Sequence, residues 1–417
     1  MNLTKEQRKQ FNEILDELGK TLDITETEYD TAVSSYMAVG KQLSKDGSIL
    51  ETYHPEILPQ GSFLIGTMIK PINEMDDLDI DLVCQLRGNK LNWTQLVLKH
   101  NVGKQIKENQ TYEKMLEKPD GRRCWTLKYR EKSDDSKKKY HMDILPAIVD
   151  NDYALFLDKA FRSKDVNNLE DYSIRITDKE IDNYSTEKNT LFWLKSNPFG
   201  YAIWFQSRAI LENSQPFLLR GNIQEVPKFQ KDKLPLQRIV QILKRHRDML
   251  FSSDEDKEDK PISIIITTLA GKSYNKEVDV LEGLFNVVEN MHKHIEEKFD
   301  KNLNRNIKWI SNPVNDEENF ADKWVEYPKR EENFYKWLAQ VKKDLANIIS
   351  ARGLSFIQAS LVQPFGEEIV KRTFNNYGAK MLKARESNTL KMAANTGLIG
   401  TKGRTIIPQH QNFGRNE

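Results

Sequence analysis

Apolar residues recur along this chain with two different spacings, and each spacing predicts a different kind of element. Over residues 3–22 they return every three or four positions, which predicts an amphipathic helix, and a second helix is expected over 27–43. Over 79–86 apolar residues first alternate with acids and then run on, which predicts a buried strand. The first part of the chain is therefore expected to combine helices with a sheet.

Two later stretches predict strands beside the first one. Residues 125–129 and the residues around 142–144 alternate between apolar and polar positions, as a strand with one buried face does. The run 131–139 between them is very polar, so we expect it to form a hairpin loop. Together these stretches predict a sheet that contains three neighbouring strands.

The acids at the start of the first predicted strand are the most informative feature. Asp79 and Asp81 point to one face because side chains alternate along a strand, while Ile80 points to the other. The predicted hairpin would bring Asp143 beside them as a third carboxylate. Clustered carboxylates repel one another, and Mg²⁺ held by carboxylates and completed by substrate phosphates would neutralise them. The alternative is an acidic run over 76–81 that simply faces solvent.

After residue 150 the spacing of apolar residues is mainly helical. Residues 196–201 are expected to form a helix-start turn, and apolar residues over 236–250 form the stripe of a helix with cations on its other faces. Beyond it we expect a charged linker over 252–260. Three helices are expected to follow, over 262–269, 277–299 and 320–349. From 385 onward the chain is rich in Asn, Thr, Gly and Lys, which predicts a mobile tail.

Composition limits the classes of function. The chain of 417 residues carries 63 Lys and Arg against 62 Asp and Glu, so no global field draws it to nucleic acid or to an anionic membrane. Cys84 and Cys124 are too few for a disulfide framework or a cysteine zinc site. No apolar run approaches the roughly 20 residues of a membrane-spanning helix. The chain starts with a polar helix, so we expect a cytoplasmic protein without membrane contact.

Several short motifs, taken in order, carry a family resemblance. The first set is Pro59-Gln60-Gly61-Ser62-Phe63, Gly66-Thr67, Asp79-Ile80-Asp81 and His141-Met142-Asp143. The second set is Ser196-Asn197-Pro198-Phe199-Gly200-Tyr201-Ala202, Leu236-Gln237-Arg238, Leu243-Lys244-Arg245-His246-Arg247-Asp248, Asn312-Pro313 and Glu318-Asn319-Phe320-Ala321-Asp322-Lys323-Trp324. Over about 50–330 the chain resembles the nucleotidyltransferase core of DNA polymerase beta, oligoadenylate synthases and cyclic GMP-AMP synthase. It is most similar to the bacterial cyclic-oligonucleotide synthases of anti-phage signalling, the CD-NTases. One departure is the gap of sixteen residues between Ser62 and Asp79, which is longer than usual.

The resemblance implies an α+β fold. It would contain a polymerase-beta-like nucleotidyltransferase core, with a mixed sheet and flanking helices, and a C-terminal helical lobe, with the active site in the cleft between them. The expected division is an N-terminal helix and catalytic core over 1–195, the helical lobe over 196–384 and the mobile tail over 385–417.

The resemblance also implies which residues form the site. Asp79, Asp81 and Asp143 would be the catalytic carboxylates and would hold two Mg²⁺ ions, which Mn²⁺ can replace. The expected triphosphate contacts are Gln60, Gly61, Ser62, Lys244 and Ser263. For each of two of these contacts, the residue pattern alone fits an ordinary role equally well. Lys244 would then be a solvated lysine on a helix face, and Ser263 an ordinary residue at a helix start. Three other candidates are expected to be structural or surface residues: His141, Arg245 and Arg247.

The activity implied is the joining of nucleoside triphosphates, ATP among them, into a cyclic di- or trinucleotide with release of pyrophosphate. The product would activate an anti-phage effector. The alternatives are a linear oligonucleotide synthase, another nucleotidyltransferase, or a non-catalytic nucleotide-binding scaffold. The tail around Gly414 resembles tails that a conjugating partner enzyme attaches to targets. Activation by DNA is not expected, because the chain has neither a zinc cluster nor a long basic face.

Overall fold

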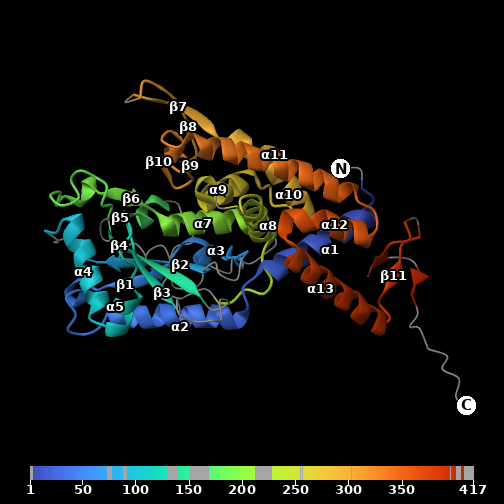
Figure 1. Ribbon diagram of the computed structural model, residues 1–417, viewed down its shortest axis with the longest axis horizontal. Coiled ribbons are helices and arrows are strands. Elements are labelled where there is room, and N and C mark those ends of the chain that lie inside the picture. The colour runs from blue at the N-terminus through green and yellow to red at the C-terminus, as the bar shows by residue number, and fades with distance from the viewer. Residues whose placement is uncertain are drawn as a thin grey trace, which may run out of the picture. The chain divides into compact units, whose positions relative to one another are not determined.

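The computed structural model describes residues 3–72, 78–87, 92–129, 139–149, 169–211, 228–253, 255, 257–301, 303–394, 396–400 and 405–407 (Figure 1). The chain divides into two compact units. The sheet unit combines 24–237 with 295–322, and the helical unit combines 1–23, 238–294 and 323–417. The domain boundaries expected at 195 and 384 stay a prediction, since these units group residues by spatial contact.

A mixed sheet organises the sheet unit. Its strands are β1 (Glu56–Pro59), β2 (Leu78–Leu86), β3 (Trp125–Tyr129), β4 (Tyr140–Val149), β5 (Ile174–Ile176) and β6 (Leu194–Ser196). They lie in the order β1-β2-β4-β5-β6, and β3 also pairs with β4. β2 and β4 are parallel, while β3 and β4 are antiparallel, as the predicted hairpin requires. The three strands expected from alternation are therefore neighbours, although most of the predicted hairpin loop lies outside the described residues.

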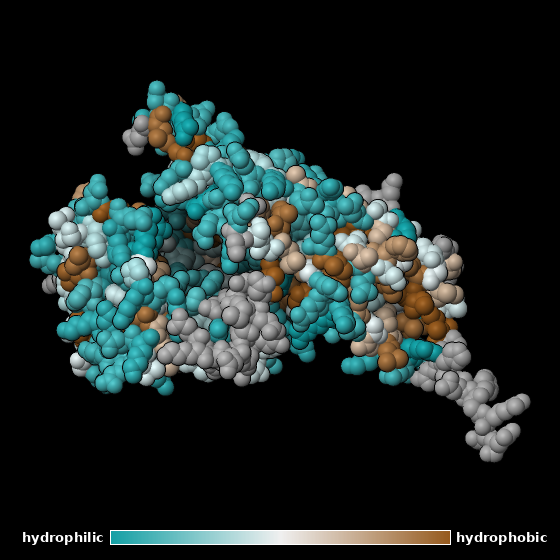
Figure 2. All heavy atoms as spheres, viewed as in Figure 1, coloured by the Kyte–Doolittle hydropathy of each residue, from teal (hydrophilic) through white to brown (hydrophobic). Residues whose placement is uncertain are grey.

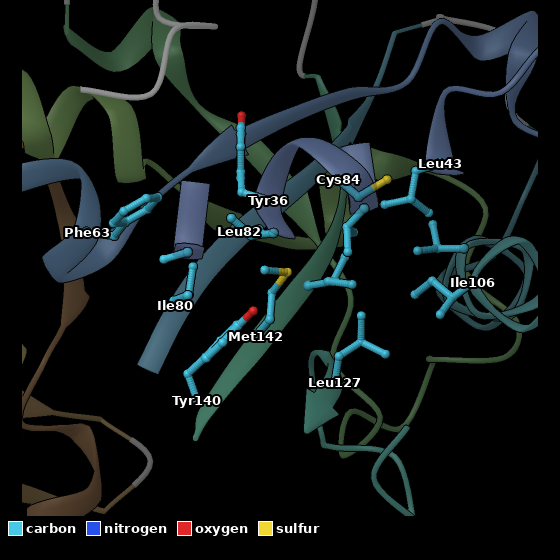
Figure 3. Packing of buried hydrophobic residues seen from close by; sticks show 14 of the residues in the cluster. Tyr36, Leu43, Phe63, Ile80, Leu82, Cys84, Ile106, Leu127, Tyr140 and Met142 are labelled. Carbon is cyan, nitrogen blue, oxygen red and sulfur yellow. The ribbon is translucent and has the colours of Figure 1, made fainter. Parts of the chain in front are cut away.

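Helices cover one face of the sheet with an apolar core. The α-helices in the described part of this unit are α2 (Glu26–Leu43), α3 (Gly61–Ile65), α4 (Gln95–Lys107), α5 (Gln110–Met115) and α7 (Pro198–Ala209), and α2 and α4 cover this face. Ile80, Leu82 and Met142 from the sheet pack with Tyr36 of α2 and Ile106 of α4 (Figure 3). Because side chains alternate along a strand, this packing leaves the neighbouring odd-numbered positions on the other face.

The opposite face carries both apolar and acidic side chains. Val83 and Leu145 pack there in a second apolar cluster with Phe199 of α7. Asp81 and Asp143 lie on this face, each two residues before one of these core positions. The second core therefore holds the strands in place directly beside the acids.

The helical unit consists mainly of α-helices. They are α1 (Lys5–Leu22), α8 (Pro235–Leu250, from Arg238 onward), α9 (Ser263–Ser273), α10 (Val280–Asn290), α11 (Pro328–Ser350), α12 (Leu354–Phe365) and α13 (Glu367–Glu386). The side chains of Thr4 and Gln7 form a capping box at the start of α1, and Thr25 and Glu28 do the same for α2. These caps explain why both helices begin close to the positions that apolar spacing predicts.

Two predictions of helix in the later chain are wrong in their extent. The helix expected over 277–299 ends at Asn290, and β7 (Glu296–Asp300) follows in a hairpin with β8 (Arg305–Trp309). Cross-strand contacts stabilise this hairpin, since the Lys298 ammonium lies 4.3 Å from the centre of the Trp309 ring. The helix expected over 320–349 begins only at Pro328.

Short strands occupy other stretches where sequence spacing predicts none. β9 (Ser311–Asn312) pairs with β10 (Asn315–Asn319) in the sheet unit. In the predicted tail, β11 (Lys391–Met392) pairs with both β12 (Ile399–Gly400) and β13 (Thr405–Ile406). The tail residues around Gly414 lie outside the described residues, so its mobility stays a prediction.

The surface shown in Figure 2 is mainly hydrophilic, as expected for a chain with 30% charged residues. Apolar side chains are exposed on α12 and α13, where Phe356 is 73% and Leu382 is 54% exposed. Among the described residues, no helix is both long enough and apolar enough to cross a membrane.

Candidate active site

Strand pairing places two of the three predicted catalytic acids side by side. In the parallel register of β2 and β4, Asp81 lies opposite Asp143 and Asp79 lies opposite His141. Neighbouring strands are about 4.8 Å apart. Asp81 and Asp143 are half-buried, whereas Asp79 is exposed at the start of β2. The expected adjacency of Asp143 to the Asp79-Ile80-Asp81 motif is thus confirmed.

Gly61 brings the Gly-Ser motif directly against Asp81. Its φ is +60°, and a Cβ added at this position would lie 2.4 Å from Oδ2 of Asp81. The amide of Gln60 donates to the carbonyl oxygen of Asp81 at 2.9 Å, which joins the motif to β2. Glycine is needed here for its backbone conformation and also for the close approach of the carboxylate. Ser62 follows in the first turn of α3, whose start has no side-chain cap.

Thr126 is a site residue that the sequence did not indicate. It lies opposite Asp143 in the antiparallel pairing of β3 with β4, and its hydroxyl donates to Oδ1 of Asp143 at 2.5 Å. This bond fixes one carboxylate oxygen and leaves Oδ2 for another partner. Alternation marks Thr126 as one of several polar strand positions, and only the register identifies it.

Cys124 lies near the same acids. Burial raises the pKa of its thiol to about 12, and the carboxylates of Asp143 and Asp81 add to the effect. The thiol therefore stays protonated at neutral pH. A protonated thiol is a poor nucleophile and a poor metal ligand, so we assign Cys124 no chemical role.

The donor set fits a hard cation in kind. Carboxylate oxygens are the ligands that Mg²⁺ prefers, and Asp79, Asp81 and Asp143 present them from one face of two adjacent strands. In the described part of the chain, however, no three Asp, Glu, His or Cys side chains are arranged as a metal-binding group. Two of the predicted ligands are thus brought together, and the assembly of all three around an ion stays a prediction.

A charged cluster fixes the turn that leads into β3. The buried carboxylate of Asp178 accepts a hydrogen bond from Nε of Arg122 at 2.6 Å and another from Nε of Arg123 at 2.9 Å. Burial alone would raise the pKa of Asp178, but these bonds and one from the Glu180 amide outweigh it and lower the pKa. The buried Lys99 ammonium donates to the carbonyl oxygen of Arg122. The cluster thereby sets the position of the residues just before Thr126.

The Asn312 to Trp324 motif builds a structural turn beside this cluster. The side chain of Asn319 accepts from the amides of Ile310 at 2.8 Å and Ala321 at 2.9 Å. Asn312 donates to the carboxylate of Glu318 at 2.7 Å. Burial raises the pKa of Glu318, although the Asn312 bond and the charge of Arg123 oppose that shift.

The Asn197-Pro198 motif is the expected helix-start turn. Oδ1 of Asn197 accepts from the amide of Gly200 at 2.8 Å and caps α7. A Cβ at Gly200 would lie 2.6 Å from that same oxygen, so the cap requires glycine. The motif thus supports the helix that covers the acidic face of the sheet.

Three cations of α8 are buried, so the interpretation of Arg245 and Arg247 as surface charges is wrong, and so is the alternative of a solvated Lys244. Lys244 is 5%, Arg245 2% and Arg247 6% exposed. Arg247 donates to the hydroxyl of Ser263 at 2.8 Å. Lys244 and Ser263 belong to the helical unit and the acids to the sheet unit, so a shared cleft stays a prediction.

Comparisons with known proteins agree with this architecture. Residues 7–160 match the family described as the Second Messenger Oligonucleotide or Dinucleotide Synthetase domain. A c-di-GMP synthase of Roseivirga ehrenbergii is 28% identical over 358 residues, which cover 85% of this chain and 84% of that protein.

Solved structures show the same fold. The CD-NTase CdnG of Bradyrhizobium diazoefficiens, in complex with GTP, aligns with a TM-score of 0.62 and 19% identity over 88% of this chain and 99% of that chain. The cyclic AMP-GMP synthase DncV of Vibrio cholerae, in complex with a linear intermediate, aligns with a TM-score of 0.51 and 15% identity over 88% and 89%. The motif order, the mixed sheet and these similarities agree: residues 7–160 are similar to the Second Messenger Oligonucleotide or Dinucleotide Synthetase domain, and the chain has the fold of the solved CD-NTases.

Proposed function

We propose that this protein is a cyclic-oligonucleotide synthase that joins nucleoside triphosphates into a cyclic di- or trinucleotide second messenger. One observation carries the proposal: Asp81 and Asp143 lie opposite each other on parallel strands, with the Gly61 backbone packed against Asp81. A fold gains nothing in stability from like charges placed opposite each other on neighbouring strands. Their placement is explained if the pair binds a cation together with a phosphate-bearing substrate.

The reaction is a nucleotidyl transfer. A ribose hydroxyl of one nucleotide attacks the α-phosphorus of another, a new P–O bond forms, and the bond to the β-phosphate oxygen breaks to release pyrophosphate. For a cyclic dinucleotide, a second transfer within the linear product closes the ring and releases a second pyrophosphate; a cyclic trinucleotide needs three transfers and releases three. Two Mg²⁺ ions, held by Asp79, Asp81 and Asp143, would stabilise the attacking and leaving oxygens.

The described residues prepare this chemistry by positioning. The glycine at 61 lets backbone approach the reacting phosphates without a side chain in the way, and Gln60 and Ser62 flank it as the proposed triphosphate contacts. Thr126 holds Asp143 in one rotamer, so its free oxygen keeps one direction. Such preorganisation supplies much of the rate of phosphoryl-type transfers.

The name of one relative supports a proposal about which nucleoside triphosphates the protein uses. The 28% identical relative is named a c-di-GMP synthase, which favours GTP as a substrate. The family resemblance implies that ATP is also among the substrates. We propose that GTP is used, and that omission of one triphosphate at a time from a four-nucleotide reaction reveals whether ATP is also used.

The deciding experiment incubates the purified chain with four labelled nucleoside triphosphates and Mg²⁺ or Mn²⁺, and then treats the products with phosphatase. A cyclic product resists phosphatase because it has no terminal phosphate, whereas a linear product is degraded. Resistant product and pyrophosphate from the wild type, absent with Asp81→Asn, support the proposal. A degraded product identifies a linear synthase. Nucleotide binding without pyrophosphate release, with and without partners from the native operon, identifies a scaffold.

The anti-phage effector, the conjugating partner and the cytoplasmic location belong to the same proposal. The tail around Gly414 would be the attachment segment, although Arg415-Asn416-Glu417 follow it and would have to be removed. Mass spectrometry of conjugates in cells that carry the native operon tests this role. A tail that stays unattached throughout infection contradicts it.

A further inference from the structure

Arg247 of α8 holds the start of α9 through two hydrogen bonds. Its Nη1 donates to Oγ of Ser263 at 2.8 Å and to the carbonyl oxygen of Pro261 at 3.1 Å. Ser263 is the first residue of α9, and Pro261 precedes it by two positions. The guanidinium is buried, so these bonds are shielded from competing water.

Asp248 fixes the other side of the same guanidinium. Its Oδ1 accepts from Nε of Arg247 at 2.8 Å and lies 2.7 Å from Nη2. The ammonium of Lys260 lies 3.4 Å from this oxygen and partly balances its charge. Because the guanidinium is planar and held along two edges, it cannot rotate away from Ser263.

The bond from Arg247 sets the polarity of the Ser263 hydroxyl. A serine hydroxyl has one proton to donate and two lone pairs that accept. Arg247 has no acceptor, so it must be the donor in this pair. The proton of Ser263 is then directed to another acceptor, and an anionic oxygen is the strongest one available.

The helix start favours the same kind of ligand. The residue before Ser263, Ile262, makes no side-chain cap at α9. The first amides of a helix lack intrahelical acceptors and carry a positive partial charge, so they attract phosphate. The oriented hydroxyl and the uncapped amides therefore point to one ligand chemistry.

We propose that Arg247 is a positioning residue for the triphosphate of the bound nucleotide. It orients the Ser263 hydroxyl as a donor and fixes the first turn of α9, while Ser263 makes the contact with phosphate. This inference rests on the proposed function, because it needs a nucleoside triphosphate as the ligand.

The test is equilibrium binding of GTP, ATP and the corresponding monophosphates to the full chain in the presence of Mg²⁺. Arg247→Lys keeps the charge but loses the two-edged geometry, and Ser263→Ala removes the hydroxyl. Each change is expected to weaken triphosphate binding about tenfold and to leave monophosphate binding within about twofold. The double variant is expected to resemble either single variant, because both remove the same contact.

Arg238→Lys is the matched control. Arg238 is also a buried arginine of α8, and its guanidinium binds the carbonyl oxygen of Gly19 at 2.9 Å and the carboxylate of Asp23 at 2.7 Å. Its replacement disturbs the same helix to a similar degree without touching Ser263. It should not separate triphosphate from monophosphate binding, and its effect should add in full to that of Ser263→Ala.

Three results would overturn the inference. The effects of Arg247→Lys and Ser263→Ala multiply to about a hundredfold, or Arg247→Lys weakens both phosphate classes equally, or it changes neither. Absence of triphosphate binding by the wild type would instead reject the proposed function. If Arg247→Lys fails to fold, Asp248→Asn, which releases the other edge of the guanidinium, is measured in its place against the same outcomes.

Discussion

Two acidic sites of the sheet unit use the same residue type in opposite ways. Asp178 is fully buried and is neutralised by the guanidinium groups of Arg122 and Arg123. Asp81 and Asp143 are half-buried and lie opposite each other on parallel strands. The first arrangement pairs a buried acid with cations, whereas the second places two acids opposite each other, where like charges repel across a strand pair. This difference distinguishes an acid that stabilises the structure, Asp178, from the acids that we propose to bind a ligand, Asp81 and Asp143.

Replacement of an acid of the opposed pair should have the largest effect, and only on activity. Asp81→Asn keeps the shape and removes the charge that a metal ion needs, so nucleotidyl transfer should fall about a thousandfold. The thermal unfolding temperature should stay the same or rise, since the repulsion with Asp143 is lost. Asp46→Asn, an exposed acid of the same unit, should change neither quantity. Loss of stability together with activity would mean that the pair is structural.

Gly61→Ala should have the next largest effect. The new Cβ would lie 2.4 Å from Oδ2 of Asp81, and the carboxylate must turn away to make room. We expect about a hundredfold lower activity with only about 1–2 kcal/mol of destabilisation from the left-handed backbone. Gly378→Ala, where nothing lies within 4 Å of the added carbon, is the control and should preserve activity. Equal activity in both variants would disprove the role of the close approach.

Asp178→Asn should reverse the pattern and reduce stability. The loss of two charge-assisted bonds is expected to cost about 2 kcal/mol, since both arginines are partly exposed and can regain water. The folded pKa of Asp178 is lowered, so its contribution is full above the unfolded pKa of about 3.9 and disappears as pH falls through the folded value. Urea unfolding between pH 7 and pH 3 measures this: the difference between wild type and variant should shrink below about pH 4. The exposed Asp182→Asn serves as control, and a difference independent of pH would contradict the assignment.

Thr126→Val should have a smaller effect on activity. It removes the hydroxyl that donates to Asp143 and keeps the shape of the side chain. We expect about a tenfold loss, the worth of one hydrogen bond to a charged group. Thr126→Ser keeps the hydroxyl and should recover most of the activity in the same pyrophosphate assay. Failure of the serine variant to recover would show that packing, and not the bond, is what matters.

Cys124 should be the least sensitive position near the acids. Cys124→Ala is expected to change activity less than about twofold, because a thiol with a pKa raised to about 12 takes no part in the chemistry. Labelling with iodoacetamide at pH 8 should be slow in the folded chain and fast in urea. Rapid labelling of the folded chain would show that the thiol is more exposed or more acidic than its surroundings imply.

Local patterns were sufficient to predict the acidic strand and the two strands beside it, but not the register in which they pair. Alternation over β2 identified the face that carries Asp79 and Asp81, because a two-residue period is a property of the strand alone. Thr126 was missed because its role depends on the register of β3 with β4, which alternation does not specify. The hairpin of β7 and β8 was missed for the same reason, since pairing across strands determines it.

The cations of α8 show the limit of periodicity more clearly. Helical spacing placed Arg247 away from the apolar stripe, and an arginine in that position usually faces water. In the structure it is buried between Asp248 and the start of α9, 14 to 16 residues further along the chain. Partners so far along the chain are invisible to a spacing of three or four residues.

The sequence by itself determined the identity and facing of the acids, the family motifs and the helix caps, because each depends on neighbours within a few residues. The tertiary structure alone decided that Asp81 lies opposite Asp143, that Gly61 must stay small beside Asp81, and that Arg247 holds Ser263. Those relations are distances between segments far apart in the chain. Only the packing of the two cores and the pairing of the strands can set them.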